Sequence, residues 1–333
     1  MTMTMGTHKN LALKRKSVGF FLSGEKGNAT TISSHEYMFI EDVQHKVIPG
    51  GRSMASERNV TIELMPDLPL GKSIIMDAFS TEHRHINLSN TISRFIEEAA
   101  FHLACKGIVR YEIVKEPLSQ SKGPDDESGP IGQGEQASVK FKVLYIPGRV
   151  VRLGTCYLQI LPQAERAQRG KAFVVIPAAN VWSLRIPSEL GGPRKLRRLL
   201  RTLARSSTPL PQFVLAAMSS LSEMKDFSFT DFARLKDLAV ACESAQWGWP
   251  ARDTWRNETL QYFHVYRHLR FTLAMAILRE SILSSMNDLL KELGFSTSFT
   301  LKGLPTPADI RSCIAKLAKD EATFEDAMKL IRL

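Results

Sequence analysis

The sequence has little of what marks secreted or membrane-spanning proteins. Its 333 residues include only four cysteines, Cys105, Cys156, Cys242 and Cys313, and no two of them form a C-x-x-C pair. Such wide spacing indicates the reduced thiols of a cytoplasmic protein rather than a disulfide framework. No run approaches the roughly 18 apolar residues that a membrane span needs, so we expect no membrane partner.

Motifs for catalysis and metal binding are also missing. The GKS triplet at 71–73 lacks the earlier glycine of a phosphate-binding loop, because Pro66 stands at that position. His264 and His268 have a spacing seen in zinc sites, but Val265 replaces the glutamate of a zinc hydrolase and a third ligand is missing. No G-x-S-x-G turn surrounds any serine. We therefore expect a protein that is not an enzyme and has no cofactor or metal.

The charge balance is uneven. Lys and Arg number 44 against 34 Asp and Glu, which gives a formal net charge of +10. A basic chain favours an anionic partner such as a nucleic acid or a membrane surface, and net charge alone does not choose between them. Hydrophobic residues make up 44% of the chain, which excludes a disordered protein and suffices for two or three packed units.

Glycine and proline are absent from residues 259–293, which form the longest helical pattern in the chain. A helix of this length would extend about 50 Å, more than a small domain needs. Its apolar residues form a broad belt, which predicts cover on more than one side, by the chain itself or by sister copies. We expect a homo-oligomer interface at these positions: Phe263, Tyr266, Leu269, Leu273 and Ile277.

Residues 193–205 give the sharpest local pattern, a helix that begins at Pro193. At 100° per residue its leucines lie on one face and its basic residues lie on the other. The basic residues are Arg194, Lys195, Arg197, Arg198, Arg201 and Arg205. They are able to hold a phosphate backbone, to meet acidic residues of another subunit, or to remain solvated. No aromatic residue interleaves with them, so any DNA contact would be insensitive to base sequence.

The chain ahead of this basic helix reads as an α+β domain over 35–192. Weak alternation through Tyr37, Phe39 and Val43 indicates short strands, and a further strand is expected over 60–65. A helix over 87–105, capped by Ser89 or Asn90, then leads into a strand over 108–114. Strands beginning at Val139, Arg149 and Lys171 are expected to form an antiparallel meander, because their connections are too short for crossover helices.

The rest of the chain completes the predicted organisation. Residues 1–34 are expected to be a flexible basic arm, and residues 117–138 a disordered loop. Residues 193–293 form a helical region, in which Trp247 and Trp249 mark a packed junction. Residues 294–333 supply a strand and a C-terminal helical tail, with Thr323 capping its last segment.

Taken in order, these elements resemble the portal proteins of tailed bacteriophages. The resemblance rests on the helix that ends in glycine before the YEIV strand, on the phrase VVIPAANVWSLRIP at 174–187, and on the tail GLPTPADIRSCIAKLAKDEATFEDAMKLIRL. It covers residues 87–333 by order of elements. The chain departs from that family in its short length, its basic charge and the lack of a clip segment between Leu210 and Thr259.

The resemblance implies a portal-like α+β fold in which the domain at 35–192 is the wing. It further implies a structural virion protein, a ring at a capsid vertex that passes double-stranded DNA through a central channel during packaging. Capsid, adaptor and packaging-motor proteins would be its partners, and it would occupy the host cytoplasm during assembly. The alternative is a nucleic-acid-binding protein of the bacterial cytoplasm without sequence preference, an accessory factor of a mobile element or defence system.

Overall fold

The computed structural model describes residues 34–49, 60–80, 87–117, 139–161, 163–206, 238–250 and 261–331. These residues form helices, antiparallel sheets and one long helix, which confirms the α+β prediction. They divide into two compact units, a small one at Pro147–Val175 and a large one that joins Ile32–Ile146 to Ile176–Leu333. The predicted arm at 1–34 and loop at 117–138 lie outside the described residues, except Ser34 and Pro117, which belong to α1 and β2.

The large unit is built around an antiparallel sheet in the order β3-β2-β7. Its strands are β2 (Ile108–Pro117), β3 (Val139–Tyr145) and β7 (Val181–Arg185). The central strand pairs Tyr111 with Tyr145 on one side and with Trp182 on the other. Strand β3 therefore does not continue into the meander that its short connections predict, because the chain between β3 and β7 forms the separate small unit.

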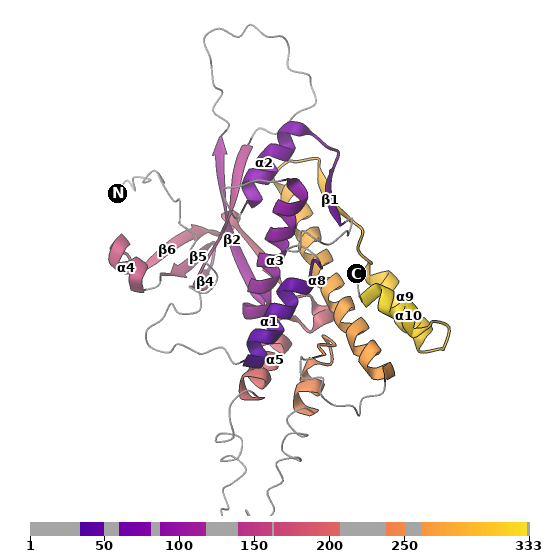
Figure 1. Cartoon of the computed structure of the whole chain (residues 1–333). Coiled ribbons are helices and arrows are strands. Elements are labelled where there is room, and N and C mark those ends of the chain that lie inside the picture. The colour runs from indigo at the N-terminus through magenta and orange to yellow at the C-terminus, as the bar shows by residue number, and fades with distance from the viewer. Residues whose placement is uncertain are drawn as a thin grey trace, which may run out of the picture. The chain divides into compact units, whose positions relative to one another are not determined.

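Three helices pack on one side of this sheet (Figure 1). They are α2 (Pro69–Phe79), α3 (Leu88–Lys106) and α8 (Gln261–Glu292). Phe79 lies at the centre of the layer, and its ring is 4.9 Å from Phe95 and 6.0 Å from Phe299, centroid to centroid. Helix α2 was not predicted; Pro69 occupies its first turn, where a helix tolerates proline.

The first described segment is a helix, α1 (Ser34–Lys46), and not the short strands expected there. Phe39 and Val43, four residues apart, are fully buried on one helical face. The rings of Trp247 and Trp249 meet Phe39 edge-on at 5.3 and 5.4 Å. The Trp249 indole also donates a buried 2.9 Å hydrogen bond to Asp42. The predicted tryptophan junction is thus confirmed, and it packs on α1.

Helix α8 confirms the predicted long helix, and the chain itself covers two of its sides. Phe271 and Leu278 face the main core. On the opposite side Leu269 and Leu273 pack into a second core with α9 (Pro307–Leu317) and α10 (Phe324–Ile331). The sequence left open whether the chain itself or sister copies cover the helix, and here the chain itself covers both of these sides. Among the described helices, none is both long enough and apolar enough to cross a membrane.

The predicted C-terminal strand and the cap of the last helix form, whereas the predicted cap of α3 is wrong. Strand β8 (Ser298–Lys302) pairs antiparallel with β1 (Thr61–Met65). The side-chain amide of Asn287 on α8 bonds both the N–H and the carbonyl of Phe299, at 2.7 and 3.1 Å. Thr323 accepts a 3.2 Å bond from the Asp326 N–H, so it caps α10 as predicted. Helix α3 is capped by Asn87 rather than by Ser89 or Asn90.

The small unit consists of a three-stranded sheet in the order β4-β5-β6 and one short helix. Its elements are β4 (Arg149–Leu153), β5 (Cys156–Ile160), α4 (Gln163–Arg169) and β6 (Phe173–Pro177). The side chain of Gln159 donates to the Pro147 carbonyl at 3.1 Å, and Arg166 donates to the Leu161 carbonyl at 2.7 Å. The predicted boundary near 192 does not separate two units, since Leu190 and Leu196 share the main core.

Gly248 provides a sharp test of how α8 is seated. It has φ +66°, and a Cβ there would lie 2.3 Å from the Arg270 Cβ and 2.7 Å from the Phe271 backbone nitrogen. We expect Gly248→Ala to lower the free energy of unfolding by at least about 3 kcal/mol, because strain and overpacking add. The matched control is Gly294→Ala, at φ +86° in open space. It should cost only about 1 to 2 kcal/mol in urea unfolding; equal losses would contradict this packing.

Candidate nucleic-acid interface

Helix α5 (Gly192–Ser206) carries the basic residues that the sequence analysis singles out. Its inner face is buried in the main core by four leucines: Leu196, Leu199, Leu200 and Leu203. Its outer face exposes all six basic residues: Arg194, Lys195, Arg197, Arg198, Arg201 and Arg205. The helix and its two faces therefore form as predicted. What the basic face binds stays a prediction.

The position of α5 is fixed at its first turn. Gly107 ends α3 with φ +74°, and a Cβ there would lie 3.0 Å from both Cα and Cβ of Pro193. This close approach sets the start of α5 against the end of α3. With the leucine face also buried, the basic face has a fixed direction before any ligand arrives.

The guanidinium groups of this face differ in what they already contact. Arg198 forms a 2.7 Å ion pair with Glu243, and Lys195 donates to the side chain of Gln246 at 3.3 Å. Arg194, Arg197 and Arg201 make no hydrogen bond or ion pair with any other described residue. We call these three residues the open arginine triad.

The triad's spacing suits a linear polyanion. Residues three and four positions apart lie on one helical face, and Arg194 and Arg201 are separated by seven residues, a rise of roughly 10 Å. Each DNA strand carries one phosphate per about 3.4 Å of helix axis, so the triad spans about three phosphates of one strand. Guanidinium remains charged at any relevant pH and binds phosphate bidentately.

The predicted oligomer-interface residues on α8 do not form one exposed patch. Leu269 is fully buried and Leu273 is 9% exposed, both inside the chain's own second core. Ile277 is half-buried against the two cores. Phe263 remains 52% exposed, and Tyr266 nearby is half-buried. Of the five predicted residues, only Phe263 and Tyr266, in the first turns of the helix, therefore keep exposed surface outside the two cores.

The two histidines of α8 lie together without forming a metal centre. Their ring centroids are 4.4 Å apart. Among the described residues no three His, Cys, Asp or Glu side chains gather where they would hold a metal ion. Burial is the largest cause that lowers the pKa of His268 to about 4; nearby His264, Lys46 and Arg267 act in the same direction, and Asp42 acts in the opposite one. His268 is therefore neutral at pH 7.

The structure also brings together a polar cluster that no sequence motif links. Lys106 on α3 donates a 2.6 Å hydrogen bond to the Tyr145 hydroxyl on β3, and His102 stacks on the Tyr145 ring at 4.0 Å. Burial raises the pKa of Cys105 to about 12 and also raises the pKa of Tyr145. Both groups thus stay protonated at pH 7, and neither is set up as a nucleophile or base.

Comparison of the chain with protein-family models, curated proteins and solved structures gives no match. The resemblance to portal proteins therefore stays a prediction.

His268 predicts a pH dependence of stability. Native His268 takes up a proton only near pH 4, whereas in the unfolded chain it does so near pH 6.5. Acid therefore favours the unfolded state, and the free energy of unfolding falls as pH drops from about 6.5 to about 4. We expect His268→Gln to reduce this loss by about 1 to 2 kcal/mol, after allowance for partial exposure. Urea unfolding of both proteins at pH 6.5 and 4.5 measures it; parallel pH responses would refute the assignment.

Proposed function

We propose that this chain binds the phosphate backbone of a nucleic acid, without sequence preference, through the basic face of α5. The observation that carries the proposal is the open arginine triad: three exposed guanidinium groups with no partner among the described residues, on a helix whose other face is buried. Because the packing of α5 already fixes the backbone of the triad, only the arginine side chains lose conformational freedom on binding. The formal net charge of +10 would further attract a polyanion over long range.

The composition of the face argues for backbone contact rather than base reading. All outward residues of the face are Arg or Lys, and no aromatic residue stands among them to stack on a base. Phosphate contacts fix position and carry no sequence information. Binding should therefore be strong at low salt, weak at high salt and similar for unrelated sequences.

Neutralising the triad tests the proposal. In the variant Arg194→Gln/Arg197→Gln/Arg201→Gln, we expect about 10- to 100-fold weaker binding to a fluorescent 20-bp DNA at low salt. We also expect the slope of the logarithm of the binding constant against the logarithm of the salt concentration to become shallower by about 3. Each lost phosphate contact removes about 0.9 from that slope. Anisotropy titrations from about 50 to 200 mM salt give both values.

A control variant with the same change in charge separates a local contact from net charge. Lys291, Lys316 and Lys319 are exposed and lie outside α5. Their triple change to Gln should leave the salt slope nearly unaltered. Glu243→Gln should act in the opposite direction and tighten binding modestly, because it frees Arg198 from its ion pair. If both triple variants weakened DNA binding equally, the proposal that α5 contacts the DNA would be wrong.

A ring-forming, portal-like assembly remains a second prediction, in which α5 would meet double-stranded DNA. Its support at α8 is now confined to the exposed aromatic end around Phe263. Native mass spectrometry of the purified chain tests it. A monodisperse ring that is lost in Phe263→Ser would support the assembly, and a monomer that still binds DNA would leave only the binding function.

A further inference from the structure

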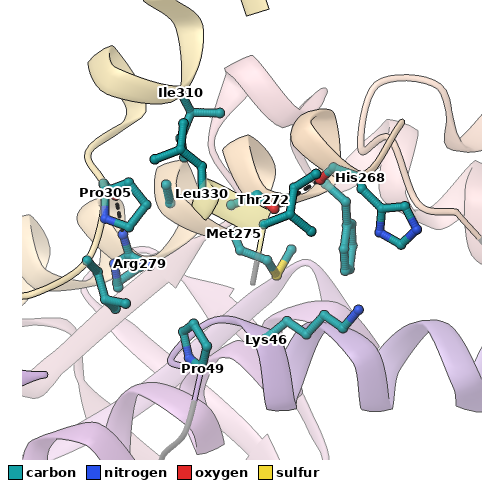
Figure 2. Close-up of a pocket in the computed structure, with 13 residues that line it drawn as sticks. Lys46, Pro49, His268, Thr272, Met275, Arg279, Pro305, Ile310 and Leu330 are labelled. Carbon is teal, nitrogen blue, oxygen red and sulfur yellow. Dashed lines mark hydrogen bonds between the residues drawn. The ribbon is translucent and has the colours of Figure 1, made fainter. Parts of the chain in front are cut away.

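A pocket of about 210 Å³ lies within the large unit, away from α5. Its walls come from the end of α1, from the middle of α8, from the segment before α9 and from the end of α10, as Figure 2 shows. The figure draws 13 lining residues, and none of these is an aspartate or glutamate. Two of them, Lys46 and Arg279, are cations. The charged side chains that line the pocket are thus both positive.

Arg279 is a buried cation with incomplete partners. It is 4% exposed, and its guanidinium donates to the carbonyls of Val47 at 3.2 Å and Pro305 at 2.8 Å. Its Nε has no hydrogen-bond partner among the described residues, and no described carboxylate forms an ion pair with it. Burial lowers its pKa to about 10, opposed by its neighbour Glu280, so it remains charged at pH 7. A buried charge without an ion-pair partner is costly, and a bound anion would relieve that cost.

Lys46 provides a second positive charge on the other side of the pocket (Figure 2). Its side chain is exposed and its amine lies 5.8 Å from the Phe271 ring centroid. It makes no hydrogen bond or ion pair with another described residue. His268, also in the wall, is neutral at pH 7 and adds a polar edge without charge. An anion entering past Lys46 would therefore meet attraction from both cations.

Apart from Thr272, whose hydroxyl donates to the His268 carbonyl, the rest of the wall is apolar and selects against highly charged ligands. Met275, Ile310 and Leu330 line the pocket, with Met275 between the two cations in the view of Figure 2. Such a wall favours a ligand with an apolar body, and it disfavours a phosphate dianion, which loses more hydration on entry. The volume equals that of roughly seven waters at about 30 Å³ each, so the ligand is small.

We propose that this pocket binds a small monocarboxylate with an apolar body, a short-chain or single-ring acid, with its carboxylate at Arg279. The apolar body lies along Met275, Ile310 and Leu330, and Lys46 raises the affinity from the open side. The site is separate from the basic face of α5, so it stands or falls independently of nucleic-acid binding.

Benzoate and hexanoate are the probes, with benzyl alcohol and hexanol as uncharged matches and phenyl phosphate as the dianion. Titration calorimetry and ligand-observed NMR on the full chain should give saturable binding of one or both acids, with Kd about 1 mM for so few atoms. The alcohols and phenyl phosphate should bind at least about 10-fold more weakly. Equal binding of acid and alcohol, tighter binding of phenyl phosphate, or no saturation by either acid would each overturn the proposal.

Variants locate the site. Lys46→Gln changes an exposed residue and should weaken carboxylate binding about 3- to 10-fold. The matched change Lys291→Gln, at an exposed lysine outside the pocket wall, should have no effect. Arg279→Lys should abolish binding if the chain still unfolds cooperatively. Where it does not fold, Lys46→Gln decides, because unaltered affinity there would place the carboxylate elsewhere.

Discussion

The burial of α8 on two opposite sides is the constraint on which the rest of the large unit depends. A helix that is apolar around most of its circumference cannot face water on both sides. The main core covers one side, and α9 with α10 covers the other. Arg279 ties this arrangement together, because it bonds the end of α1 and the segment before α9 at once. The C-terminal residues from 294 onward are therefore part of the core's closure.

The same logic explains why α5 is free to act at the surface. Its leucines complete the main core, and its basic residues face outward. One short helix therefore both stabilises the large unit and gives it a positively charged surface. Surface substitutions on that face cost little stability, since exposed ion pairs such as Arg198–Glu243 contribute at most about 1 kcal/mol. Binding and folding can therefore be changed separately.

How much of this the sequence predicts depends on how local each feature is. The faces of α5 and the cap of α10 follow from residues within one or two turns, and both form as predicted. Helix α1 was missed because Phe39 and Val43 were interpreted with Tyr37 as alternation, although four-residue spacing fits one helical face. The covering of Leu269 by α10 depends on residues some fifty positions downstream, which no local pattern reveals.

The two candidate sites also differ in how local they are in the sequence. The triad lies within eight consecutive residues, so a helical projection finds it. The pocket draws its wall from residues between 46 and 331, and its buried arginine looks like any other position of an amphipathic helix. Only tertiary packing shows that no carboxylate in the described part of the chain forms an ion pair with this arginine.

The pairing of β1 with β8 has a further consequence, for biosynthesis. Glu63 lies opposite Thr300, so the two-stranded sheet joins segments more than two hundred residues apart. It cannot form until β8 (Ser298–Lys302) has left the ribosome. Until then the apolar faces of α1 and α3 lack part of their cover, and closing so long a loop is slow. The nascent polypeptide therefore leaves part of these apolar faces uncovered until residues about two hundred positions downstream of β1 have been made.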